Sequence, residues 1–171
     1  MVDLKKRPER YYSGTLRMPE EMLLMLDRVT GYWPDGGSKG LGKLRAEKDV
    51  NIREWFFKAH FFNDPVQPGS LGVEALIQLV QFYMIDKDMG KGIKDPRFEP
   101  LWIGKPIAWK YRGQVTPKNT MIISEVNILE TGNDEKGPYA IAEGWLWVDG
   151  LRTYYVKDMG MRIVPGGHRQ P

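Results

Sequence analysis

The sequence contains no cysteine and only two histidines. The absence of cysteine excludes a disulfide framework, a thiolate metal site and a cysteine nucleophile. It also fits the reducing cytoplasm, which is where we expect the protein to act. With so few nitrogen ligands and no sulfur ligand, we expect no metal site.

Long apolar runs are also missing. No uninterrupted apolar stretch of about 18 residues occurs, so we expect neither a transmembrane helix nor a membrane partner. The opening residues, MVDLKKRPERYYSG, are charged and lack the apolar region of a secretory signal. Within the sequence, therefore, nothing indicates targeting to a membrane.

Charge of one sign is not concentrated anywhere. The formal net charge is +3 and the pI about 9.0, with Lys and Arg interleaved among Asp and Glu. Nucleic-acid binding would require a basic stripe or a recognition motif, and neither is found. A mildly basic surface instead suits an acidic protein partner.

The length and the 42% of hydrophobic residues are sufficient for one folded domain. We expect an N-terminal arm over residues 1–14, a single domain over 15–165 and a flexible tail over 166–171. Two prolines and a glycine in DPVQPG precede an apolar helix predicted over Ser70–Asp86. Strands are predicted on both sides of it, with an Asp149-Gly150 hairpin between the last two. The predicted strands cover Gly42–Val50, Ile107–Val115, Thr120–Glu130, Tyr139–Val148 and Leu151–Val164. One apolar helix and an antiparallel meander predict an α+β fold in which the sheet wraps the helix.

A narrow polar stripe runs along this apolar helix. Ser70, Glu74, Gln78 and Gln81 follow one another at spacings of four, four and three residues, which places them on one face. The stripe could be the solvent face of an amphipathic helix. Alternatively, Glu74 lies in an apolar groove, where a carboxyl tends to keep its proton and can act as an acid.

His60 lies among aromatic residues in FFKAHFFNDP. A lone histidine in such a setting is often a packed, hydrogen-bonded residue. Paired with Glu74, however, it could act as a base while the carboxyl acts as the acid. Gly69 comes directly before the predicted helix, where free backbone N–H groups and the helix dipole favour negative charge, such as that on a thioester oxygen.

The segment AHFFNDPVQPGSLGVEALIQLVQFYM resembles the active-site segment of bacterial β-hydroxyacyl-ACP dehydratases. The segment is especially similar to the 3-hydroxydecanoyl-ACP dehydratase/isomerase type, and it also resembles the dehydratase domains of polyunsaturated fatty acid synthases. The resemblance extends over most of Met22–Val164 through four further segments: MLLMLDRV, REWFFKAHF, RGQVTP and GWLWVDGLRTYYVKDMGMRIV.

The resemblance implies a hotdog fold, in which an antiparallel sheet wraps one long central helix, and a homodimer with shared active sites. The histidine of one protomer, here His60, faces the acid of the other, here Glu74. The backbone N–H of Gly69 would bind the substrate carbonyl. The Val66 carbonyl would orient the His60 ring, and Gln78 would support the acid, with Ser70 also on its stripe.

The implied reaction removes water from a (3R)-hydroxyacyl thioester on acyl carrier protein, giving a trans-2-enoyl thioester in fatty acid or polyketide-type biosynthesis. The substrate carries phosphopantetheine, and no separate cofactor is expected. The isomerase type usually has Asp where this chain has Glu74, which leaves isomerisation open. Two alternatives remain: a hotdog acyl thioesterase, and a non-catalytic hotdog half of a larger synthase.

Overall fold

The apolar segment after Pro68 forms the long helix α3 (Gly69–Asp86), one residue longer than predicted. Pro68 is its N-cap, and most of its side chains are buried. The computed structural model describes residues 1–99 and 106–166. Over those residues, no helix has both the length and the apolar character needed to cross a membrane.

An antiparallel sheet forms the second layer. Over the described residues it has eight strands in the order β1-β2-β3-β6-β7-β8-β4, and β5 also pairs with β8. The strands are β1 (Val2–Asp3), β2 (Arg28–Trp33), β3 (Lys43–Asp49), β4 (Arg97–Phe98), β5 (Ala108–Tyr111), β6 (Met121–Asp134), β7 (Gly137–Val148) and β8 (Leu151–Val164). The predicted antiparallel meander is thus present in its long strands β6, β7 and β8.

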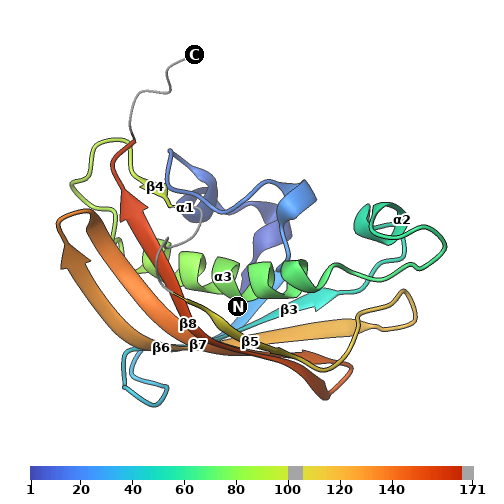
Figure 1. Ribbon diagram of the computed structural model, residues 1–171. Coiled ribbons are helices and arrows are strands. Elements are labelled where there is room, and N and C mark those ends of the chain that lie inside the picture. The colour runs from blue at the N-terminus through green and yellow to red at the C-terminus, as the bar shows by residue number, and fades with distance from the viewer. Residues whose placement is uncertain (100–105, 167–171) are drawn as a thin grey trace.

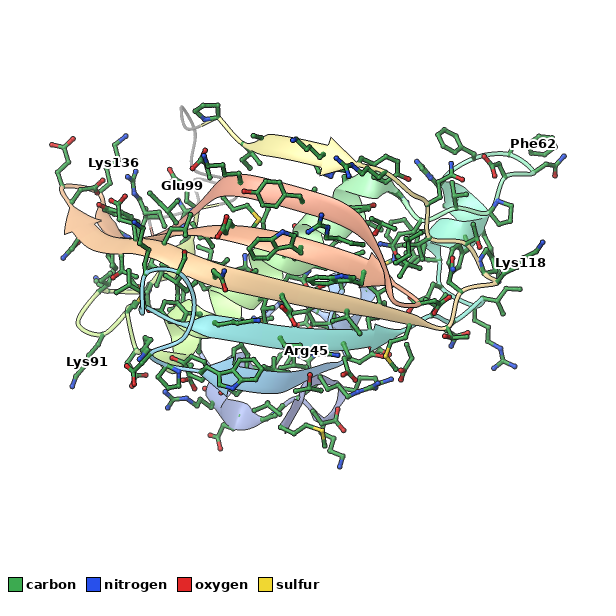
Figure 2. The ribbon with its side chains drawn as sticks, turned by 90° about the horizontal axis from the view of Figure 1, so that it is seen from below. Arg45, Phe62, Lys91, Glu99, Lys118 and Lys136 are labelled. Carbon is green, nitrogen blue, oxygen red and sulfur yellow. The ribbon has the colours of Figure 1, made fainter. Side chains whose placement is uncertain are left out.

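The sheet curves beneath α3 (Figure 1). Burial alternates residue by residue along β3 and along most of β6, because successive side chains point to opposite faces of a strand. The inner face packs on the helix, and no helix covers the outer face in Figure 2, where Arg45 lies. The helix is therefore covered by the sheet on one side only.

The N-terminal segment covers α3 on the side away from the sheet (Figure 1). It contains β1, the 3-10 turns η1 (Leu4–Lys6) and η2 (Glu21–Leu23), and the short helix α1 (Glu9–Tyr12). Tyr11 stacks on Phe82 with ring centroids 4.4 Å apart, and its hydroxyl donates to Asp86. Residues expected to form an arm thus pack on the helix, and this packing explains why α3 is apolar on most sides.

The turn between β7 and β8 is the predicted Asp149-Gly150 hairpin. Both residues have positive φ, 48° for Asp149 and 84° for Gly150, as a type I′ turn requires. The Asp149 carboxylate accepts hydrogen bonds from the loop before β6, including 2.6 Å from the Thr120 hydroxyl and 2.9 Å from the Asn119 amide. The hairpin therefore fixes the neighbouring loop as well as its own strands. The tail expected over 166–171 lies, beyond Gly166, outside the described residues.

Candidate active site

Gln78 holds the carboxyl of Glu74. Its Nε2 donates to Glu74 Oε1 at 2.8 Å and to the Leu23 carbonyl at 2.8 Å, and its Oε1 accepts from the Met25 N–H at 2.8 Å. A backbone N–H can only donate, so this contact fixes which side-chain atom of Gln78 is the oxygen. Both amide hydrogens and the amide oxygen are then in use, and Gln78 is 0% exposed. The predicted support of the acid by Gln78 is present as a hydrogen bond.

The exposure of the polar stripe decreases along the helix from Ser70 to Gln78. Ser70 is exposed, Glu74 is half-buried and Gln78 is fully buried against Leu23 and Met25. The solvent-face interpretation therefore holds for Ser70 and fails for Gln78. Glu74 lies between the two, with one oxygen held by a buried amide.

His60 is the C-cap of the four-residue helix α2 (Phe56–Ala59). Its Nδ1 lies 3.1 Å from the Val66 carbonyl oxygen, the contact that the sequence predicted. A proton on Nδ1 would be donated to this carbonyl, which leaves the Nε2 lone pair free to act as a base. The Val66 N–H donates to the Asp64 carbonyl at 2.9 Å, so Val66 is itself held by a turn.

The surface around His60 is apolar and uncovered. The Phe61 ring lies 3.9 Å from the imidazole, centroid to centroid. Phe61 is 55% exposed and Phe62 is 95% exposed. Phe62 lies at the edge of the molecule in Figure 2, and α2 stands apart from the main layers in Figure 1. Within one chain the base thus has a hydrogen-bond partner but little cover.

The backbone of residues 22–25 contacts both the start of α2, which bears His60, and Gln78, which holds Glu74. The Met22 carbonyl accepts 2.7 Å from the indole N–H of Trp55, directly before α2, and Leu23 and Met25 hold Gln78. In the sequence, residues 22–25 appear only as part of the MLLMLDRV segment that resembles the dehydratases. The sequence could not reveal this role because the groups that act are main-chain atoms, which any residue supplies.

Gly69 is the first residue of α3, and the first N–H groups of a helix have no partner within it. A Cβ at Gly69 would come within 3.0 Å of the Trp109 ring and 3.5 Å of the Tyr111 ring. Glycine therefore permits these rings to lie over the helix start. The rings of Trp109 and Tyr111 also contact Tyr154, and burial raises the pKa of the Tyr154 phenol. The sequence did not connect Trp109 or Tyr111 with this position.

His60 and Glu74 are not joined by a hydrogen bond in the described part of the chain: the ring contacts Val66 and the carboxyl contacts Gln78. In the same residues, no three His, Asp or Glu side chains gather closely enough to hold a metal ion. Within the described residues, a single chain therefore orients a candidate base and a candidate acid without joining them by a hydrogen bond.

Comparisons with known proteins give a family and a fold. Residues 18–157 match the family described as FabA-like domain. The chain is 43% identical over 143 residues to one of the subunits that make up the polyunsaturated fatty acid synthase of Thraustochytrium sp. (strain ATCC 26185 / S-3). This alignment covers 82% of the chain but spans only 9% of that relative's length.

Two solved structures are similar in shape. The dehydratase heterocomplex ApeI:P from Xenorhabdus doucetiae matches with a TM-score of 0.60 and 15% identity, covering 91% of this chain and 93% of that one. A probable thioesterase from Bartonella henselae matches with a TM-score of 0.51 and 8% identity, over 71% of this chain and 90% of that one. At such identities the likeness concerns the fold, and it confirms the predicted hotdog arrangement.

Proposed function

The chain belongs to the family of FabA-like domains, and from that premise we propose that it is a dehydratase that converts a (3R)-hydroxyacyl thioester to a trans-2-enoyl thioester. The supporting observation is that the two groups such a reaction needs are each oriented by a hydrogen bond, His60 by Val66 and Glu74 by Gln78. A hydro-lyase needs one group to accept the C2 proton and another to donate to the leaving hydroxyl.

In the proposed mechanism, Nε2 of His60 removes a proton from C2 of the substrate. The N–H of Gly69 donates to the thioester carbonyl, which takes up the developing negative charge. Glu74 gives its proton to the 3-hydroxyl, the C–O bond breaks, and water leaves. Because Gln78 donates to Oε1 of Glu74, the proton to be transferred lies on Oε2, and the same hydrogen bond stabilises the carboxylate formed.

We further propose that the base and the acid of one site come from different copies of the chain. Each chain orients both groups but does not join them, and the exposed Phe61 and Phe62 beside His60 provide apolar surface for a second copy to cover. An acyl carrier protein would deliver the substrate on its phosphopantetheine arm, as fatty acid or polyketide-type biosynthesis requires. Isomerisation of the product stays open, because the acid is Glu74.

The test is product analysis with 3-hydroxyacyl carriers of several chain lengths. We expect enoyl absorbance to rise without release of free thiol. Thiol release without an enoyl intermediate would identify a thioesterase. No reaction with any chain length, on acyl carrier protein or on CoA, would indicate a non-catalytic hotdog.

A further inference from the structure

A hollow on the sheet is lined by positive charge without any Asp or Glu. Its volume is about 280 Å³, and its lining includes Lys110, Arg112, Arg152, Trp145 and Tyr155. Lys110 lies on β5, Arg152 and Tyr155 lie on β8, and Trp145 lies on β7. The Arg112 N–H donates to the Thr153 carbonyl at 2.9 Å, which fixes the chain after β5 beside β8.

This hollow lies on the outer face of the sheet. Lys110 is opposite Tyr155 in the β5–β8 register, and Tyr155 is opposite Trp145 in the β7–β8 register. The Tyr155 and Trp145 rings are stacked, with centroids 5.6 Å apart. The preceding residue, Tyr154, packs its ring on Gly72 of α3, so Tyr155 points away from the helix. The side chains of Lys110, Tyr155 and Trp145 thus lie on the outer face of the sheet, away from the helix α3 on which Glu74 lies.

Its cations lack counter-charges. In the described part of the chain, Lys110, Arg112 and Arg152 form no ion pair, and all three side chains are exposed. A second hollow of similar size, about 290 Å³, contains Lys48 and Lys5, but each of these is paired with an acid, Glu54 at 2.7 Å and Asp27 at 3.1 Å. Of these two hollows, the first is the one whose cations have no acid partner within the described residues. Glu143 lies beside its lining but accepts a hydrogen bond from Tyr155 at 3.1 Å, so an anion could still neutralise the three cations.

Outside the hollow, the exposed Lys157 of β8 also lies on this face and forms no ion pair within the described residues. Further across the same face, Lys43 and Arg45 are paired with Glu125 at 3.1 and 3.6 Å. An acidic protein surface would require cations spread over a wide area, whereas three of the unpaired cations of this face lie together at one recess. Two guanidinium groups and an ammonium suit a phosphate group, because the planar fork of Arg matches two phosphate oxygens.

We propose that this hollow binds the anion of a phosphate ester. Two phosphate esters fit the proposed dehydratase function: the phosphate of the phosphopantetheine arm and the nucleotide phosphates of CoA. The choice of these two rests on that proposed function. Both present the same chemistry to Arg112, Arg152 and Lys110, and they differ in the group attached to it.

The experiment is calorimetric titration of the full chain with 4′-phosphopantetheine, with adenosine 3′,5′-bisphosphate and with inorganic phosphate. We expect saturable binding that weakens as salt is added. Arg112→Glu with Arg152→Glu should weaken binding at least about tenfold, because two charge-assisted contacts are lost. Whichever organic phosphate binds more tightly identifies the source, and either result supports the site.

The matched control is Arg53→Glu with Lys118→Glu, which makes the same change in net charge at exposed cations outside the hollow. It should bind as the unmodified chain does. Absence of binding for all three phosphates, or equal loss in both double variants, would overturn the proposal. If the first double variant does not fold, the single variant Arg152→Gln repeats the comparison. None of the three phosphates is an acyl thioester, so binding is measured without turnover, and failure of the dehydratase assay does not affect this result.

Discussion

Glu74 lies on an 18-residue helix buried between the sheet and the N-terminal segment, whereas His60 caps a four-residue helix beside phenylalanines that are 55% and 95% exposed. The acid is held through Gln78, whose amide makes three hydrogen bonds. Within the described residues, the imidazole of the base has one hydrogen-bond partner, the Val66 carbonyl. The region around the acid is therefore complete within one chain, and the region around the base is not.

This difference indicates that association with a second chain would gain free energy on the side of His60. Burying apolar surface contributes about 25 cal/mol per Å², so exposed phenylalanines next to a functional imidazole favour a partner that covers them. A rigid acid and a loosely covered base are what we expect when the second copy of the chain completes the site.

Removing either proton-transfer group should have the largest effect. We expect His60→Ala and Glu74→Gln each to lower kcat by at least about 100-fold, because general acid–base catalysis contributes on this scale. Steady-state kinetics on the purified variants measures it. Activity within a few fold of the unmodified chain in either variant would remove that residue from the mechanism.

Removing the support of the acid should have the next largest effect. Gln78→Met leaves the Met25 N–H and the Leu23 carbonyl without a partner, at a cost of about 1–3 kcal/mol in the free energy of unfolding. It also frees the Glu74 carboxyl, so kcat should fall about tenfold while KM changes little. Denaturant unfolding and steady-state kinetics test both parts.

Gln81→Met is the control for this change. Gln81 lies on the same helix, is half-buried, and its side-chain amide makes no hydrogen bond within the described residues. Its substitution should leave kcat unchanged. If both substitutions lower kcat equally, Gln78 does not position the acid.

On the side of the base, Trp55→Phe removes the indole N–H that donates to Met22 and keeps an aromatic ring. This should loosen α2, lowering kcat by less than Gln78→Met does, and destabilising the fold by about 1 kcal/mol. Trp33→Phe, at a half-exposed tryptophan on β2, is the matched control. Steady-state kinetics compares kcat of the two variants. A lower kcat in Trp55→Phe than in Trp33→Phe would show that the hydrogen bond to Met22 helps to position His60.

The hairpin at Asp149 provides a test that should not affect either region. Hydrogen bonds from Thr120 and Asn119 hold the pKa of the Asp149 carboxyl well below its usual range. A lowered pKa means that this stabilisation is present above the ordinary pKa of about 4 and is lost as the pH falls through the folded-state value. Asn tolerates the positive φ at this position.

We therefore expect Asp149→Asn to lower Tm at pH 7, and the difference from the unmodified chain to narrow in acid. Thermal melts across pH measure this, with kcat unchanged at neutral pH. A Tm difference that stays constant down to strongly acidic pH would show that the carboxylate charge is not the cause.

Local sequence patterns predicted those parts of the fold that depend on local periodicity. The apolar helix α3, the long strands β6 to β8 and the Asp149-Gly150 turn all occur as expected. Strand β2 was not predicted, because Gly31 interrupts its β-branched residues and its pairing with β3 shifts register there. The two-residue strand β1 is too short to show a period.

For the candidate site, the sequence predicted two local contacts but not how Gln78 is anchored. The contacts of His60 with Val66 and of Glu74 with Gln78 lie within one short motif, and both are present. The anchoring of Gln78 by Leu23 and Met25 joins residues more than 50 positions apart through main-chain atoms. Side-chain identity carries no information about such contacts, so only the folded chain reveals them.

The most direct test uses a mixed dimer. His60→Ala and Glu74→Gln chains carrying different tags would be co-expressed, and mixed dimers purified through both tags. If the two groups of each site come from different chains, one of the two sites in the mixed dimer keeps both, and about half of the unmodified activity should return. Mixed dimers as inactive as either single variant would show that base and acid do not meet across the interface.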